Sequence, residues 1–416
     1  MLLHIPPSLH HRRFRLYWAG MAISIAGSQM QVWALFWHVR TLTDQPIALG
    51  GIGLARILPI IFFSLIGGAV ADVANRRRVL FITQSVMALV ALALAYYTVQ
   101  GTLTLWHIYG LTALQAVAIS FDTPARQSLI PNLVPPRDLP NAFSMQSIAH
   151  QTGAIVGPAL SGLVIAYWGQ AYTYLMNGFS FLSVILALAL IGPIAQQVQR
   201  SQNGVVSLGA IREGLRFIIS HPIILATMLL DFFATFFSSA NTLMPVIAVD
   251  ILRVGAVEYG WLSAAQSIGA VTAALVISQL PHIRRQGPVF LSAVLAFGLA
   301  TVAFGFMRTF PMAMLALISI GASDSVSTII RNTIRQLQTP DYIRGRMVSI
   351  NQIFFMGGPQ LGEVEAGVVA QFFGAPFAII SGGVGCILAV GWVVRRFPQL
   401  RTFNGDELLP QPAIAD

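Results

Sequence analysis

Charged side chains are scarce in this sequence: they make up 9% of its 416 residues, whereas 56% are hydrophobic. A soluble domain carries about 25% charged residues. A water-soluble chain of this length cannot solvate its surface with so few. The composition therefore excludes a soluble enzyme and predicts a protein that crosses the lipid bilayer several times.

Lysine is absent, so all 24 basic residues are arginine. Without lysine the chain cannot form the phosphate-binding loop Gly-x-x-x-x-Gly-Lys-Ser/Thr, which excludes ATP hydrolysis by this chain. The net charge of +9 is typical of nucleic-acid binding. That function needs basic residues clustered on a water-facing domain, and no long soluble segment is present. We therefore expect no nucleic-acid partner.

Cysteine occurs once, as Cys386 in an apolar run. One thiol excludes an internal disulfide and a multi-cysteine metal site, so we predict that Cys386 packs as a small apolar side chain. His4, His10 and His11 are too sparse to predict a metal site. We expect no metal and no cofactor, and no catalytic set of nucleophile, histidine and acid.

Twelve apolar runs reach the length of about 20 residues that a helix needs to cross a bilayer. We expect helices, because backbone groups in lipid need internal partners, and the ten-residue alternation of a membrane barrel is missing. The expected spans are residues 16–40, 49–71, 79–100, 104–125, 142–168, 171–193, 222–249, 257–281, 287–307, 311–333, 346–372 and 375–394.

The arginines indicate the orientation, because cytoplasmic connections are rich in basic residues. With these spans, 20 arginines fall on the side that holds both termini and 3 on the other side, while Arg56 lies inside a span. We therefore predict an integral plasma membrane (inner membrane) protein with both termini in the cytoplasm.

The longest internal connection, residues 194–221, divides the spans six and six. It predicts an N-terminal half over 1–193, a C-terminal half over 222–396 and a cytoplasmic tail over 397–416. Apolar residues at helical spacing from Ser207 onward predict an amphipathic helix in the connection, on the membrane surface or as an ordinary solvated linker helix.

The two halves repeat each other. Arg126-Gln127-Ser128 closes the fourth span and Arg331-Asn332-Thr333 closes the tenth, and the fifth and eleventh spans carry Gly157-Pro158 and Gly358-Pro359. Repeats of the same orientation put a binding site at the interface of the halves, near the midplane.

The connection after the second span combines glycines, an acid and arginines: Gly67, Gly68, Asp72, Arg76, Arg77 and Arg78. With twelve spans and a six-plus-six repeat, it resembles the loop signature of the major facilitator superfamily. The resemblance implies the all-helical fold of that family and a conformational latch at Gly68, Asp72, Arg76 and Arg77. Two positions depart from the signature: Val73 replaces a basic residue and Asn75 replaces a glycine.

The fifth span carries Gly153, Gly157, Pro158 and Gly162. Gly153 and Gly157 form a small-residue face for close packing, and Pro158 removes a backbone donor. The segment resembles the helix-packing signature of antiporters that export drugs, with Ser161 in place of one glycine. Residues 123–131 and 343–346 are similar to the branch with siderophore and macrolide exporters, although residues 111–117 lack the arginine of the drug–proton branch.

Ionisable groups at bilayer depth are functional candidates, because each costs about 2.5–3.5 kcal/mol to insert. Asp231 and Asp324 lie near the middle of the seventh and tenth spans, where we expect proton coupling or substrate binding. Glu363 and Glu365 lie deep in the eleventh span but point about 200° apart on a regular helix, so one helix face cannot present both.

Three further features have two interpretations each. Asp122 and Arg126 are spaced to form an ion pair, as a gate or structural pair or as part of a substrate site. Gln29 and Trp33 share a helix face that suits a ligand, or they serve helix packing. His150 packs through a hydrogen bond or relays protons.

We expect a secondary exporter of amphipathic small molecules, drug- or siderophore-like, that works as a monomer by proton-coupled antiport and alternating access. Its partners would be the lipid bilayer, the small-molecule substrate and protons. Two alternatives stay open. One is a lipid or lysolipid translocator without proton coupling, and the other is a non-transporting membrane scaffold or receptor.

Overall fold

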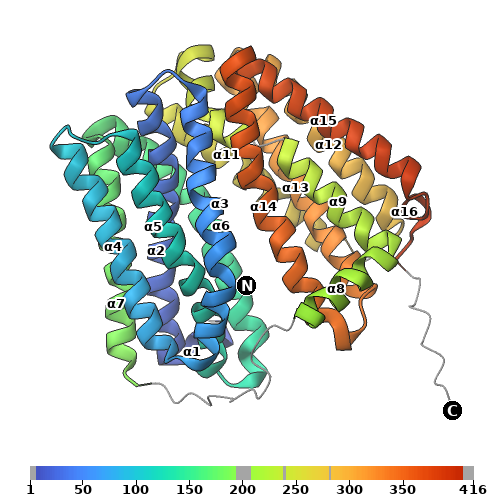
Figure 1. Cartoon of the computed structure of the whole chain (residues 1–416), viewed down its shortest axis with the longest axis horizontal. Helices are drawn as coiled ribbons and strands as arrows, with labels where there is room; N and C mark the ends of the chain where they lie inside the picture. Colours follow the sequence, from blue (N-terminus) through green and yellow to red (C-terminus); the bar gives the residue numbers. More distant parts are fainter. Residues whose placement is uncertain (1–5, 194–207, 238–239, 281–282, 406–416) are drawn as a thin grey trace. The chain divides into compact units, whose positions relative to one another are not determined.

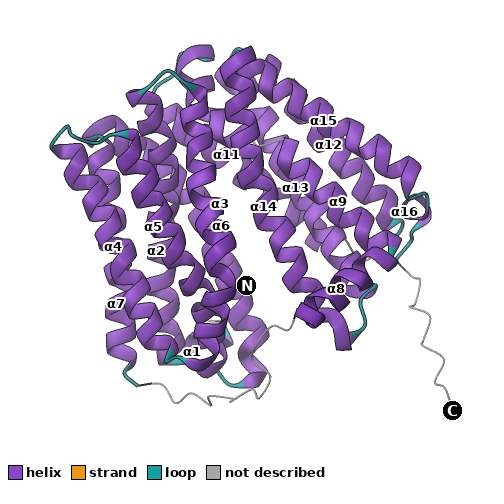
Figure 2. Cartoon of the chain, in the orientation of Figure 1, coloured by secondary structure: helices purple, strands orange, loops and turns teal. Residues whose placement is uncertain are grey.

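The computed structural model describes residues 6–193, 208–237, 240–280 and 283–405, and the regular structure of these ranges is helical throughout (Figure 2). The long helices are α2 (Arg12–Leu42), α3 (Pro46–Val73), α4 (Arg76–Val99), α5 (Leu105–Leu129), α6 (Leu139–Trp168), α7 (Gln170–Ile191), α9 (Pro222–Phe237), α11 (Ala256–Ser278), α12 (Gln286–Phe306), α13 (Phe310–Leu337), α14 (Asp341–Phe373) and α15 (Ala375–Arg396).

The short elements connect these helices or flank them. They are α1 (Pro7–His10), η1 (Ile130–Asn132), η2 (Pro136–Asp138), α8 (Leu208–Ser220), η3 (Ala240–Leu243), α10 (Met244–Val246), the π-helical turn η4 (Ile247–Ile251) and α16 (Gln399–Thr402).

Nine segments of the described chain are long and apolar enough to cross a membrane. The other three expected spans are α2, α5 and α14, with 31, 25 and 33 residues. These three are the helices that carry Gln29, Asp122, Glu363 and Glu365. The all-helical fold class expected from the sequence is confirmed.

Two glycines 205 residues apart end corresponding helices in the same way. Gly169 follows α6 and Gly374 follows α14, with φ angles of 86° and 85°. A residue with a side chain rarely adopts this left-handed conformation, so glycine is the residue that turns the chain directly into the next helix.

Two compact units make up the chain, coloured along the sequence in Figure 1. In unit 1, helix α2 packs on α6 and α7, and α4 packs on α5 and α7. In unit 2 the corresponding helices pair in the same way: α9 with α14 and α15, and α12 with α13 and α15. The packing therefore repeats, as the sequence motifs predict.

Unit 1 comprises residues 1–205 and 244–264, and unit 2 comprises residues 206–243 and 265–416. The boundaries follow the six-plus-six division of the sequence except at residues 244–264. This segment lies in the second half of the sequence, yet its contacts make it part of the first unit.

The helix expected in the connection between the halves is α8. Its Phe217 and Ile218 are buried against Ile224, Met347 and neighbouring side chains of unit 2. Leu215 and Ile219 remain exposed. Part of the apolar face of α8 thus packs on protein, and the rest is open to solvent or lipid. Residues 194–207 of the predicted linker lie outside the described residues.

Substituting one glycine of unit 2 tests how tightly its helices pack. A Cβ atom at Gly321 would overlap the backbone of Gln266, whereas one at Gly391 would meet no atom within 4 Å. We expect Gly321→Ala to lower the free energy of unfolding by about 1–3 kcal/mol. Gly391→Ala should raise it slightly, by about 0.5–1 kcal/mol, because alanine favours a helix. Thermal unfolding of the purified variants measures both, and equal stability would contradict the close approach of α11 and α13.

Candidate functional site

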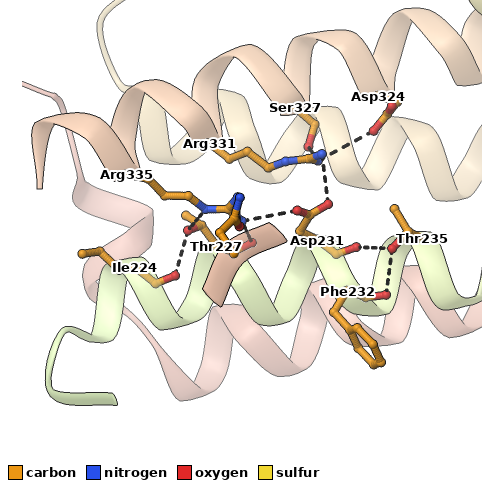
Figure 3. Close-up of polar contacts among 10 residues, drawn as sticks. Ile224, Thr227, Asp231, Phe232, Thr235, Asp324, Ser327, Arg331 and Arg335 are labelled. Atoms are coloured by element: carbon orange, nitrogen blue, oxygen red, sulfur yellow. Dashed lines mark hydrogen bonds and ion pairs between the residues drawn. The ribbon is translucent and has the colours of Figure 1, made fainter. Parts of the chain in front are cut away.

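A line of polar side chains on α9 faces a second line on α13 within unit 2 (Figure 3). On each helix the residues recur every three or four positions, which keeps them on one face. The residues are Thr227 and Asp231 on α9, and Asp324, Ser327, Arg331 and Arg335 on α13.

Asp231 lies between two guanidinium groups. Its Oδ1 is 3.0 Å from Arg331 Nη2, and its Oδ2 is 3.4 Å from Arg335 Nη2. The three side chains are at most 4% exposed. Burial of an unpaired charge is very costly, and pairing offsets part of that cost. The two arginines therefore stabilise the ionised carboxylate of Asp231 and tie α9 to α13.

Arg335 is held by three residues on two other helices, α9 and α14. Its Nε donates to Thr227 Oγ1 at 3.1 Å and its Nη2 to the Thr227 carbonyl at 2.9 Å. Its Nη1 donates to Asn351 Oδ1 on α14 at 2.6 Å. With Asp231 these contacts occupy each nitrogen of the guanidinium, so Arg335 has a fixed, structural position.

Asp324 occupies a different environment. Its Oδ1 lies 3.7 Å from Arg331 Nη1, and its side chain is 49% exposed. The same Nη1 donates to Ser327 Oγ at 3.2 Å. Arg331 is thus shared between a close, buried carboxylate on another helix and a more distant, half-exposed one on its own helix.

Unit 1 contains the repeat-related arginine, Arg126, with a different arrangement. Its Nε and Nη2 donate to Asp122 Oδ2 at 2.9 and 2.6 Å, one turn earlier on α5. Asp122 Oδ1 accepts from Thr83 Oγ1 and Gln84 Nε2 on α4. The predicted Asp122–Arg126 ion pair is confirmed, whereas its role as a gate stays a prediction. The acid that balances the arginine is local here but comes from another helix in unit 2.

Gln29 and Trp33 do not form an open face on α2. Trp33 is 9% exposed and packs edge-on against Tyr259, with ring centroids 6.1 Å apart. Gln29 lies against Gly157 of α6. These contacts correspond to the packing interpretation. Gln31 on the same helix has polar partners: it donates to Gln115 on α5 and accepts from Asn177 on α7.

The loop between α3 and α4 has a defined internal structure. Asn75 caps α4, since its Oδ1 accepts from the Arg78 amide at 3.2 Å. Arg76 donates to the Ser128 carbonyl and to Asn132, and Arg77 donates to the Leu188 carbonyl. These contacts fasten the loop to α5 and α7. No atom lies within 4 Å of a Cβ built on Gly68, and the side chain of Asp72 lies outside the described residues. The latch role of these residues stays a prediction.

The glycines of α6 pack against neighbouring backbones. A Cβ on Gly153 would meet Ile25, and one on Gly157 would lie 2.9 Å from the Ala26 carbonyl of α2. Gly162 lies against Gly260 of α11. Pro158 is buried inside the same helix. The close-packing face predicted for this segment is present.

The two glutamates of α14 lie on a continuous helix, Asp341–Phe373, and both are partly buried. The helix does not unwind around them, so Glu363 and Glu365 point in different directions.

Arg56 lies 5.4 Å from the centre of the Phe36 ring. Cys386 is fully buried, as expected for a packing residue.

Arg331 and Arg335 are two of the 20 arginines that the sequence analysis assigned to the cytoplasmic side. They are buried in α13 and belong to the site. Sequence reasoning missed Arg335, Thr227 and Asn351. The spacing of four residues between Arg331 and Arg335 is a signal for Arg335, because it puts both on the face that carries Asp324. Thr227 and Asn351 had no such signal.

The model of one protein family, described as transmembrane secretion effector, matches residues 6–414. This covers nearly the whole chain. The chain belongs to this family of major facilitator transporters. It is therefore an integral membrane protein that transports small molecules, and it is not an enzyme.

The transporter resembles two named relatives along most of its length. It is 27% identical over 388 residues to the multidrug efflux pump Tap of Mycolicibacterium fortuitum, covering 91% of this chain and 94% of the relative. It is 24% identical over 416 residues to the enterobactin exporter EntS of Shigella boydii serotype 18, covering 100% of this chain and 98% of the relative.

Solved transporter structures share the fold. A bacterial homologue of the iron transporter ferroportin aligns with a TM-score of 0.67 and 15% identity over 94% of this chain and 99% of that one. A bacterial homologue of the lysosomal transporter Spinster aligns with a TM-score of 0.68 and 13% identity over 94% of this chain and 98% of that one.

Amide substitutions at the two acids distinguish their structural roles. Asp231→Asn leaves two buried guanidiniums without a carboxylate between them, and we expect it to lower the free energy of unfolding by about 3 kcal/mol. Asp324→Asn removes a half-exposed partner and should cost about 1 kcal/mol or less. Thermal unfolding in detergent measures the difference. Equal losses would contradict the asymmetric sharing of Arg331.

Proposed function

We propose that this transporter exports amphipathic small molecules by proton-coupled antiport, through alternating access of its two halves. Two relatives with full-length similarity are named as exporters, one of drugs and one of a siderophore. The glycine-rich face of α6 and its Pro158 support the same direction of transport, since they resemble the packing segment of export antiporters.

Proton coupling needs an acid that gains and loses a proton at an acceptable cost. Water or cargo must reach it, and neither protonation state should leave a buried charge without a partner. Asp231 meets neither condition. It is 2% exposed, and protonating it would leave Arg331 and Arg335 facing each other without an anion between them.

Asp324 meets both conditions. Half of its side chain is exposed, and the guanidinium 3.7 Å away is already paired with Asp231. When Asp324 takes up a proton, Arg331 keeps its closer carboxylate. This geometry is the observation that carries the proposal: Asp324 is the proton-exchanging residue, and Asp231 is the fixed anion that makes the exchange tolerable.

Protonation of Asp324 changes the charge of the cluster in unit 2. Asp231 and Asp324 balance Arg331 and Arg335 when all four are ionised, and one positive charge is in excess when Asp324 is protonated. A change of one charge at bilayer depth amounts to several kcal/mol. It is therefore large enough to favour one state of the transport cycle over the other.

The remaining roles follow the sequence predictions. We propose that both termini are cytoplasmic, that the loop with Gly68, Asp72, Arg76 and Arg77 acts as a latch, and that Asp122–Arg126 acts as a gate pair. Glu363 and Glu365 are further candidates for coupling. We propose a monomer as the working unit.

Uptake into everted membrane vesicles tests the mechanism. A macrolide, a catecholate siderophore and a lysolipid serve as labelled probes, with and without a proton gradient. We expect the wild-type protein to accumulate at least one probe only when the gradient is present. Asp324→Asn should abolish this dependence, because an amide exchanges no proton at neutral pH, whereas Asp324→Glu should retain it.

Asp44→Asn is the control, since it removes an acid that is 91% exposed in the connection between α2 and α3 and should leave the gradient dependence intact. Gradient-dependent uptake by Asp324→Asn would overturn the assignment. Accumulation of the lysolipid without a gradient would favour the lipid translocator, and absence of transport by the folded wild-type protein would favour a scaffold or receptor.

A further inference from the structure

Three side-chain amides in unit 1 form a directed chain of hydrogen bonds. Asn177 on α7 donates through Nδ2 to Gln31 Oε1 on α2 at 2.7 Å, and Gln31 donates through Nε2 to Gln115 Oε1 on α5 at 2.6 Å. At the start of the chain, Ser180 Oγ donates to Asn177 Oδ1 at 2.9 Å. Each amide oxygen therefore accepts a hydrogen bond from the residue before it, and the chain ends at Gln115.

The last amide of this chain presents a donor. Gln31 and Asn177 are at most 1% exposed, whereas Gln115 is partly exposed. Turning over one buried amide would set donor against donor or acceptor against acceptor, which is costly away from water. The oxygen of Gln115 is occupied by Gln31, and the described residues provide no acceptor for its Nε2. Two N–H donors are therefore what Gln115 offers to an incoming molecule.

A second donor group lies against the same helix α2. The Cζ atom of Arg56 on α3 is 5.4 Å from the centre of the Phe36 ring, and Arg56 is partly buried. Arg56 lies ten residues after the start of α3, which is about 15 Å along the helix axis. A guanidinium at this depth is costly, keeps its charge and has donors but no acceptor.

The two donor groups come from adjoining segments of α3 and α5. These helices touch at two points, Gly51 against the Tyr109 ring and Gly67 against the Ser120 carbonyl. The arginine of α3 and the glutamine of α5 both lie between these points along their helices, and both contact α2. The fold of unit 1 thus directs both groups toward one helix.

The acid of α5 offers no acceptor to a bound molecule. Asp122 Oδ1 accepts from Thr83 Oγ1 and Gln84 Nε2, and its Oδ2 accepts two hydrogen bonds from Arg126. Four donors fill the acceptor positions of an ionised carboxylate. Asp122 is therefore not available to a cationic group, although it is the acid on the helix that carries Gln115.

We propose that Gln115 and Arg56 form a subsite for an anionic, oxygen-rich group of the cargo, such as a carboxylate. An anion accepts from the N–H groups of an amide and from the planar donors of a guanidinium, and such charge-assisted hydrogen bonds are strong. A cationic group finds no acceptor at these two side chains. The inference rests on the proposed export of amphipathic molecules and adds that the exported molecules are anions.

Equilibrium dialysis of the purified protein in detergent measures this preference. The probes are naphthoate, its neutral amide naphthamide and the cation naphthylmethylammonium, and micelles without protein give the blank. The three probes share one apolar ring system, so a difference between them reports the polar group. We expect the wild-type protein to bind naphthoate about tenfold more tightly than either of the others at neutral pH.

Gln115→Glu tests the direction of the amide chain. The glutamate keeps an oxygen for Gln31 and replaces the two donors by an acceptor. Naphthoate should then bind about tenfold more weakly, and naphthylmethylammonium should become the preferred probe.

Arg56→Gln tests the charge. It should lower the affinity for naphthoate about tenfold and leave that for naphthamide within about twofold, because the amide carries no charge. Arg56→Lys retains the cation and should retain the preference for naphthoate. The matched control is Arg137→Gln, since Arg137 is an arginine of unit 1 whose side chain is 84% exposed, and this variant should bind all three probes like the wild-type protein.

Three results would overturn the subsite. They are equal affinity of the wild-type protein for the three probes, an unchanged preference in Gln115→Glu and Arg56→Gln, and an equal loss of naphthoate binding in Arg137→Gln and Arg56→Gln. Thermal unfolding identifies the folded variants before dialysis, and either folded variant at position 56 or 115 suffices. The dialysis uses no proton gradient, so failure of the subsite is distinguishable from failure of the antiport, which the vesicle assay tests.

Discussion

The rest of the site depends on one interaction, the ionised carboxylate of Asp231 between the guanidiniums of Arg331 and Arg335. Three charges buried at bilayer depth would be costly if they were separate. Together they fix the face of α13 against α9, with Thr227 and Asn351 satisfying the remaining donors of Arg335. In the proposed mechanism this anion stays in place, which lets Asp324, the second acid near Arg331, change its charge.

The two repeat-related arginines have different partners. Arg126 in unit 1 has its acid one turn away on its own helix, and Thr83 and Gln84 occupy the other oxygen of that acid. Arg331 has Ser327 at the corresponding position one turn away, and its acid comes from α9. The ion pair of unit 1 thus lies within α5, whereas the ion pair of unit 2 joins α9 to α13. This difference is the reason that we propose proton exchange in the second unit.

Local patterns predicted the fold and the local contacts well. Apolar runs predicted the long helices, the motifs Gly157-Pro158 and Gly358-Pro359 indicated the repeat, and the spacing of Asp122 and Arg126 predicted their ion pair. Contacts between distant segments carried no comparable signal, because Asp231 and Arg335 are 104 residues apart and meet only when α9 packs on α13. For the same reason the docking of residues 244–264 on unit 1 could not be predicted, since its glycine crossing and aromatic contacts depend on tertiary structure.

The central claim is that Asp324 exchanges the proton while Asp231 stays ionised. Infrared difference spectra of the purified protein between neutral and acidic pH test it most directly, because a carboxylic acid has a C=O band that a carboxylate lacks. The account predicts that such bands grow on acidification, that Asp324→Asn removes one of them and that Asp122→Asn retains it. A band that survives in Asp324→Asn and disappears in Asp231→Asn would contradict it.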